Sequence, residues 1–451
     1  MSQARPSLVR QPDFVKLWAA ASVSLLGTQI SLIAIPVIAV VLLGAPPFQV
    51  ALLGTIEFLP FLLFTLPAGV WVDRLPRRHV LIVGDVGRAI MLASIPVAYA
   101  FGALTIWQLY VVGFVNGIMT VLFDIADMSY LPTIVERDQL VEGNAKLQAS
   151  FSLAQVIGQP VGGGVVGLLS APRAVLLDAI SFVVSAVLIL AIRRREHSAQ
   201  PTTAEAAPDG QVADLAGRGI SAQVEAAVTA DPPTSRSVRR EVADGLRFVV
   251  GNRYLRPISA TTGSSNLFNN ILFGVYPVFA YRDLGLSPEV VGLIGGSFGI
   301  GALVGAMVAS RVAAVIGVGP AIIASAAINA PAALLIPIST TETALVLMSI
   351  GGFVSGWANV VYNVNQVSLR QTITPERMLG RMNATMRFIV WGTIPIGQIV
   401  GGLLATVFST VVAIWVGAIG GLFAFLPTFF SPVRPLRKIP EVDEGAATSP
   451  A

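Results

Sequence analysis

A carboxylic acid, Glu57, stands in the middle of an apolar run from Phe48 to Val72. It lies about nine residues into that run, or roughly 14 Å at about 1.5 Å per residue, near the centre of a bilayer core about 30 Å thick. Burial there favours the protonated acid, whereas contact with water releases the proton. We therefore predict proton coupling at Glu57. A neutral acid hydrogen-bonded within a helix bundle is the alternative, with equal weight.

Four further carboxylates stand in or beside apolar runs, where an ionisable side chain is a functional hypothesis by default. Asp85 and Arg88 are three residues apart and share a helix face, so we predict a structural ion pair in preference to a coupling site. Asp124 and Asp127 share a face in the same way. Asp124 is a second candidate for proton coupling, and Asp127 is shallow enough for a contact at the cytoplasmic surface. Asp178 is expected to cap or anchor its helix.

A third group of residues combines amide side chains with aromatic rings in the middle of apolar runs. Such a mixture suits large amphiphilic and often cationic molecules, through apolar contact and cation–π attraction. For each asparagine, hydrogen bonding between helices is an equally good explanation. The predicted cavity residues are Gln29, Phe61, Phe64, Asn266, Asn269, Asn270, Phe273, Asn359, Tyr362, Asn363, Phe388 and Trp391.

Membrane-spanning helices are the elements that must position these groups. Of the 451 residues 54% are hydrophobic and 12% are charged, and the charged share is about half that of a soluble domain. Each span needs roughly 20 apolar residues, so the composition excludes a soluble enzyme and predicts an all-α polytopic membrane protein. The twelve predicted spans are 17–43, 48–72, 80–101, 106–131, 149–169, 174–192, 258–280, 290–312, 320–338, 343–369, 383–408 and 410–430, with a turn at Ser409–Thr410.

The distribution of basic residues orients these spans. Positive charge near span ends favours the cytoplasmic side, and an even number of spans puts nearly all of it on one side, with both termini cytoplasmic. The exceptions are Arg173 and Arg282. The first apolar run has the length of a span and lacks a cleavage site, so no cleaved signal is expected. The cytoplasmic set is Arg5, Arg10, Lys16, Arg74, Arg77, Arg78, Lys146, Arg193, Arg194, Arg195, Arg311, Arg370, Arg381, Arg434, Arg437 and Lys438.

Several kinds of chemistry are excluded by composition. The chain has no cysteine and two histidines, His79 and His197, which several apolar runs separate. A metal site, disulfides and thiolate chemistry are therefore not expected. No nucleophile–base set and no phosphate-binding glycine loop is present, so we expect neither an enzyme nor ATP as the energy source. The net charge of +4 is split into short clusters between apolar runs, which does not suit nucleic acid.

An internal repeat divides the chain into two halves of six spans. At an offset of 239 residues, Gly113-Phe114-Val115 aligns with Gly352-Phe353-Val354, and Asn144-Ala145 aligns with Asn383-Ala384. Parallel halves of this kind are typical of transporters that rock about a central site. The predicted organisation is a bundle over 1–195, a disordered cytoplasmic linker over 196–240, a second bundle over 241–431 and a cytoplasmic tail over 432–451.

The segment G-V-W-V-D-R-L-P-R-R from Gly69 to Arg78 resembles the signature loop of the major facilitator superfamily, with Pro76 in place of a glycine. The resemblance covers the whole chain and implies a cytoplasmic gate. In this gate Asp73 would accept N–H groups at a helix N-terminus, and the arginines would pair with acids such as Asp127. A plain topology signal is the alternative, and it does not explain the aspartate. The implied gate residues are Gly69, Asp73, Arg74, Arg77, Arg78 and Asp127.

Within that superfamily, the segment from Ser368 to Ala384 and its counterpart in the first half resemble the third group of drug:proton antiporters. This group includes macrolide-efflux proteins, enterobactin exporters and a lysophospholipid transporter. The resemblance implies a bacterial inner-membrane exporter of small amphiphilic drugs and antibiotics, powered by the proton motive force and without a cofactor. Its partners would be lipid, substrate and protons, and we expect a monomer.

Two other functions remain open on the sequence alone. An exporter of siderophores or a transporter of lysophospholipids would prefer a more basic or laterally open cavity. A membrane sensor or scaffold without transport activity would need a folded signalling domain, against which the composition of the linker argues.

Overall fold

The computed structural model describes residues 8–136, 139–193 and 238–438. The described regular structure is helical throughout. The first half contains α1 (Pro12–Val37), α2 (Pro47–Asp73), α3 (Arg77–Ala100), α4 (Ile106–Ile134), α5 (Leu140–Leu169) and α6 (Ala171–Leu190). The second half contains α8 (Val238–Gly251), α9 (Leu255–Phe273), α10 (Tyr276–Val278), α11 (Pro288–Ile316), α12 (Val318–Leu334), α13 (Ala344–Thr372), α14 (Glu376–Val407), α15 (Thr410–Leu422) and α16 (Leu426–Phe429).

Ten of the twelve predicted spans each match one helix, and the spans 258–280 and 410–430 are each interrupted, at α9–α10 and at α15–α16. The polytopic all-α prediction is confirmed. Ten described helices are long and apolar enough to cross a membrane. The other two predicted spans are α9, which carries three asparagines, and α12, which has 17 residues. The turn predicted at Ser409–Thr410 is present, and the Ser409 hydroxyl accepts a hydrogen bond from the Val412 N–H at the start of α15.

The helix boundaries differ most from the predicted spans on the side of the molecule that carries the termini. Helix α5 starts at Leu140, nine residues before the predicted span, and α13 runs three residues past its predicted end to Thr372. Both extensions carry charged side chains, and hydropathy detects only the part of a helix that suits lipid. The amphipathic helix α8 was not predicted. Most of the predicted linker and the end of the tail lie outside the described residues.

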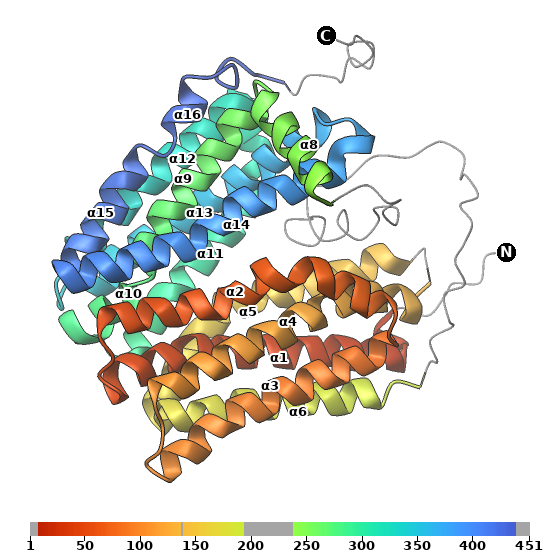
Figure 1. Ribbon diagram of the computed structural model, residues 1–451, viewed down its shortest axis with the longest axis vertical. Helices are drawn as coiled ribbons and strands as arrows, with labels where there is room; N and C mark the ends of the chain where they lie inside the picture. The colour runs from red at the N-terminus through yellow and green to blue at the C-terminus, as the bar shows by residue number, and fades with distance from the viewer. Residues whose placement is uncertain (1–7, 137–138, 194–237, 439–451) are drawn as a thin grey trace.

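The two halves form separate bundles, seen as the red-to-yellow and green-to-blue groups of helices in Figure 1. In the first bundle α1 packs on α5 and α6, and α3 packs on α4 and α6. In the second, α11 packs closely on α13 because glycines replace larger side chains. A Cβ added at Gly301 would lie 2.0 Å from the Phe353 carbonyl oxygen, and one at Gly356 would lie 2.1 Å from that of Phe298.

The bundles contact each other through α5 with α11 and through α2 with α14. Both contacts involve the helix segments farthest from the chain termini, and in Figure 1 the bundles diverge toward the side where the termini lie. The α5–α11 contact is again made by glycines. A Cβ at Gly163 would lie 2.4 Å from the Pro288 carbonyl oxygen, and one at Gly292 would lie 2.5 Å from that of Gln159. Backbone therefore touches backbone at this end.

The loops at this closed end repeat between the halves. A π-helical turn ends α1 at Ile38–Leu42, and another follows α10 at Phe279–Asp283. Gly44 and Gly285 follow them, both with φ of +62°, a conformation that side chains with a Cβ rarely adopt. The repeat recognised in the sequence at other helices therefore extends to the closed end.

Candidate functional site

A polar cavity of about 220 Å³ lies within the second bundle, between α9, α12, α13 and α14. Six of the twelve residues predicted for a cavity line it: Asn266, Asn269, Asn359, Tyr362, Asn363 and Trp391. They converge because α9, α13 and α14 each contribute one face to the cavity. The Asn266 amide donates to the Val390 carbonyl at 3.2 Å, and the hydroxyls of Thr262 and Tyr362 lie 2.6 Å apart.

A ladder of polar side chains runs along one face of α13 beside this cavity. Its members are spaced four, three and four residues apart, which keeps them on one side of a helix. Arg370 donates to Gln366 Oε1 at 3.1 Å, Gln366 donates to Asn363 Oδ1 at 3.3 Å, and Asn363 donates to Asn359 Oδ1 at 3.1 Å. The ladder connects the end of α13 nearest the termini to the middle of the cavity.

The position of Arg370 differs from the prediction of a cytoplasmic loop beyond Leu369. Because α13 continues to Thr372, the side chain turns inward, and Arg370 is only 5% exposed. Its described acceptors are the neutral oxygens of Gln366 and Asn383, and its Nε is buried without a partner among the described residues. No described ion pair involves it.

Arg387 also lines the cavity, and it was not among the predicted cavity residues. Its guanidinium lies 4.9 Å from the centre of the Trp391 ring. Its Nε and Nη2 are buried and have no hydrogen-bond partner among the described residues. The available signal was an arginine four residues inside a predicted span, which is uncommon without a function.

An aromatic row connects this cavity to the first bundle. Trp391 of α14 meets Phe58 of α2 edge-on at 5.8 Å, and Phe58 stacks on Phe61 at 5.6 Å. The predicted Phe61 therefore lies behind Phe58, which was not predicted. Together these rings give the cavity an apolar neighbour across the interface between the halves.

The remaining predicted cavity residues lie elsewhere, because a helical wheel does not show which face packs inward. Gln29 is buried against Gly158 of α5, and Phe64 meets Phe114 edge-on at 6.3 Å. The Asn270 amide donates within α9 to the Asn266 carbonyl at 2.8 Å. Phe273 and Phe388 do not line the cavity, and their side chains are exposed.

The candidate acids of the first bundle lie away from this cavity. Glu57 packs against α4, where a Cβ at Gly113 would lie 2.7 Å from its Cγ. The structure describes neither an ion pair nor a hydrogen bond for the Glu57 side chain. Asp124 is exposed on α4 and lies within electrostatic reach of Arg88.

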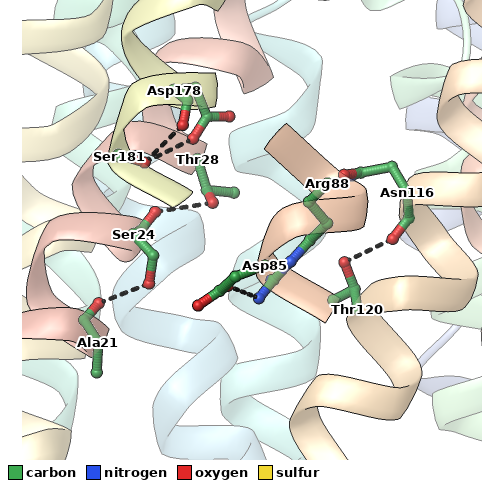
Figure 2. A network of polar contacts seen from close by, with 9 residues as sticks. All are labelled: Ala21, Ser24, Thr28, Asp85, Arg88, Asn116, Thr120, Asp178 and Ser181. Carbon is green, nitrogen blue, oxygen red and sulfur yellow. Dashed lines mark hydrogen bonds and ion pairs between the residues drawn. The ribbon is translucent and has the colours of Figure 1, made fainter. Parts of the chain in front are cut away.

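The predicted pair of Asp85 and Arg88 is present, with Nη2 and Oδ1 2.5 Å apart and both side chains buried (Figure 2). The guanidinium lies between the rings of Phe123 and Phe182, 4.2 Å from each centre. Asp178 is buried and accepts hydrogen bonds from Ser31 and from Ser181, so it joins α1 to α6 as an anchor.

The structure describes the side chains of only part of the predicted gate segment. Arg77 Nη1 donates to the Ser129 carbonyl at 3.0 Å, which sets the segment two residues from Asp127 on α4. Arg78 donates to the Leu190 carbonyl at the end of α6, and Arg74 is exposed. Gly69 has open space beside it, and the Asp73 side chain lies outside the described residues. The gate remains a prediction.

A charged contact joins the halves at the closed end. Arg282, in the π-helical turn after α10, donates from Nη2 to the carbonyl oxygens of Val40 at 3.2 Å and Ala45 at 2.9 Å. These carbonyls belong to the equivalent turn of the first bundle. Arg282 was an exception to the charge pattern in the sequence, and its contact supplies a structural reason for its position.

Comparison with known proteins places this architecture in a family. The profile of the Major Facilitator Superfamily matches residues 17–264 and 258–450, almost the whole chain. The chain belongs to the Major Facilitator Superfamily. It is therefore a multi-pass membrane protein of a transporter superfamily, as its sequence motifs predicted.

Curated relatives within the superfamily cover most of the chain. The multidrug efflux pump Tap of Mycolicibacterium fortuitum is 28% identical over 79% of this chain and 80% of its own. Tap of Mycobacterium tuberculosis (strain ATCC 25618 / H37Rv) is 25% identical over 88% of this chain and 87% of its own.

Solved structures of low sequence identity share the fold. A bacterial homologue of the iron transporter ferroportin, in an inward-facing state, matches with a TM-score of 0.70 at 16% identity, over 94% of this chain and 99% of its own. A bacterial homologue of the lysosomal transporter Spinster, also inward-facing, matches with a TM-score of 0.64 at 14% identity, over 93% of this chain and 98% of its own.

Proposed function

We propose that this protein exports small amphiphilic compounds, drugs and antibiotics among them, across the bacterial cytoplasmic membrane in exchange for protons. The observation that carries the proposal is a polar cavity in the second of two bundles, which contact each other at one end only (Figure 1). The similarity of this chain, over most of its length, to efflux pumps named Tap supports drug export.

The direction of opening follows from the predicted topology. With both termini in the cytoplasm, the closed end is the outer one, and the bundles diverge toward the cytoplasm. This inward-open arrangement suits the uptake of substrate from the cytoplasm or from the inner leaflet. Rocking of the bundles would separate α5 from α11 and α2 from α14, and would open the cavity outward.

Proton coupling rests on Glu57, with Asp124 as the second candidate. Glu57 packs on α4 beside Gly113 and has no described side-chain partner that would compensate its charge. A change in its surroundings between the two states would therefore alternately favour proton binding and release. Each proton that moves inward supplies about 2.3 kcal/mol per 100 mV.

Proteoliposomes with an imposed pH gradient test this function. The wild-type protein should drive efflux of an amphiphilic dye that an uncoupler abolishes. Glu57→Gln should retain dye binding and dye counterflow without a gradient, and should lose the response to the gradient. Glu342→Gln, in the exposed turn before α13, is the matched control. Undiminished proton-driven efflux in Glu57→Gln would refute the coupling role, and failure of the wild type to transport any dye would refute the function.

A further inference from the structure

The cavity of the second bundle carries positive charge that no described carboxylate neutralises. Of its eighteen lining residues, two are arginines, Arg370 and Arg387, and the others are neutral. The structure describes no ion pair for either arginine. Burying a cation without a counter-charge is costly. A bound anion would therefore stabilise the two arginines in this cavity.

The two arginines differ in the hydrogen-bond donors that they leave available for a ligand. Arg370 is held by Gln366 and Asn383, so it is fixed in position and contributes mainly its charge. Arg387 has two buried donor nitrogens, Nε and Nη2, without a hydrogen-bond partner among the described residues. Adjacent donors of this kind match two oxygens of a carboxylate or phosphate.

The ring of Trp391 already contacts a cation of the protein. The guanidinium of Arg387 already lies over it, 4.9 Å from the ring centre, and this stacking also orients the arginine. At Trp391, a cation–π position is thus already filled by a side chain of the protein. A second cation at the ring would face the charge of Arg387 at short range.

We propose that this cavity binds the anionic group, a carboxylate or phosphate, of the transported amphiphile, with Arg387 as its direct ligand and Arg370 as a fixed second charge. This inference rests on the proposed function and narrows its substrate class to anionic or zwitterionic amphiphiles. The cavity of about 220 Å³ is smaller than a drug-sized pocket of roughly 300–1,000 Å³. It therefore holds the head group, and the apolar remainder extends along Phe58 and Phe61 of the first bundle.

Binding to the full-length protein in phosphatidylcholine nanodiscs tests the proposal, by calorimetric titration with empty nanodiscs subtracted. The probes are dodecyl phosphate and dodecyltrimethylammonium, which share a chain and differ in the sign of the head group. The wild type should bind the phosphate more tightly. Arg387→Gln should weaken phosphate binding about tenfold or more, as expected for loss of a charge-assisted hydrogen bond. Arg387→Lys should restore most of it.

Arg434→Gln is the matched control, because Arg434 also stacks on an aromatic ring, 4.5 Å from the centre of Phe429, and is exposed. It should leave both affinities within about twofold. A thermal melt confirms that each variant is folded, and Arg387→Lys keeps the test valid if Arg387→Gln is not. Equal phosphate affinity in wild type and Arg387→Gln, or tighter binding of the ammonium probe by the wild type, would overturn the proposal.

Two further competition experiments identify the source of the anion. Competition by inorganic phosphate would assign the affinity to the anionic group alone, and competition by phosphatidylglycerol in the nanodisc would assign it to a lipid head group. Both results support the anion site. Proton-driven dye efflux with binding that ignores head-group charge would reject this inference and leave the proposed function standing. Charge-selective binding without any proton-driven export would support the anion site and reject the proposed function.

Discussion

Arg88 carries a full charge inside the first bundle, and its surroundings explain how that charge is tolerated. Asp85 neutralises it at 2.5 Å, and two phenylalanine rings cover both faces of the guanidinium. Polar groups buried among lipid-facing helices must be satisfied within the protein. The pair therefore holds α3 in place against α4 and α6, and it belongs to stability more than to transport.

We expect Asp85→Ala to destabilise the protein by about 3–5 kcal/mol, because it leaves Arg88 buried without its counter-charge. The double variant Asp85→Leu with Arg88→Met should recover much of that loss, since it removes both charges. Thermal unfolding in detergent measures the effect. Glu142→Gln breaks a more exposed pair with Lys146, 3.6 Å apart, and should cost about 1 kcal/mol or less. Equal shifts for the buried and exposed pairs would contradict this account.

At the scale of helices, glycines set the distance between α5 and α11, so these two helices form the closed end by backbone contact. Gly163 and Gly164 are neighbours in α5 with opposite surroundings. A Cβ at Gly163 would lie 2.4 Å from the Pro288 carbonyl oxygen, and a Cβ at Gly164 would meet nothing within 4 Å. The effect of a single methyl group should therefore depend on which of the two glycines receives it.

Gly163→Ala should prevent full closure and reduce the initial rate of transport about tenfold or more, because neither backbone can yield without moving a helix. Gly164→Ala should leave transport unchanged and stabilise α5 slightly, since alanine is preferred to glycine in a helix by about 1 kcal/mol. Initial transport rates and melting temperatures of both variants check this. Similar rates in the two variants would show that close contact at Gly163 is not required.

At the scale of the whole molecule, Arg282 links the bundles at the closed end. Its two hydrogen bonds reach carbonyl oxygens on the opposite half, so they must break when the bundles separate there. Hydrogen bonds from a charged donor contribute about 1.5–3 kcal/mol each. Their loss should favour the state that is open at this end.

Arg282→Ala should raise the open population about tenfold or more. The chain has no cysteine, so spin labels at Phe101→Cys and Glu342→Cys, in exposed loops at this end of the two halves, report the separation directly. A longer distance should gain weight in the distribution. Arg173→Ala, an exposed arginine at the same end of the first half, should leave the distribution unchanged. An unaltered distribution in Arg282→Ala would exclude the link.

The predicted topology also applies to the whole molecule. Epitope tags at the two ends should both be accessible only from the cytoplasmic side in right-side-out and inside-out vesicles, as the basic residues predict. If a tag at either end were accessible from outside, the predicted twelve-span topology would be wrong. The assignment of the open side of the bundles to the cytoplasm would then also be wrong.

The sequence by itself determined the number, order and approximate limits of the spans, because the apolar length that crosses a bilayer is fixed by its thickness. The superfamily was also accessible, from a local motif and an internal repeat. The buried pair of Asp85 and Arg88 followed from a spacing of three residues. The spans, the motif and the pair depend on residues close together in the chain, and the repeat is found by comparing the sequence with itself, so none of them requires a tertiary structure.

Only the tertiary structure decided which polar residues share a cavity. Trp391 lines it whereas Phe388, three residues earlier, is exposed, and hydropathy cannot separate them because lipid and bundle interior are similarly apolar. Arg370 and Arg387 come from two helices, and their unneutralised charge appears only once both helices are packed around one cavity. The direction in which each helix faces depends on its partners, and those partners lie far away in the sequence.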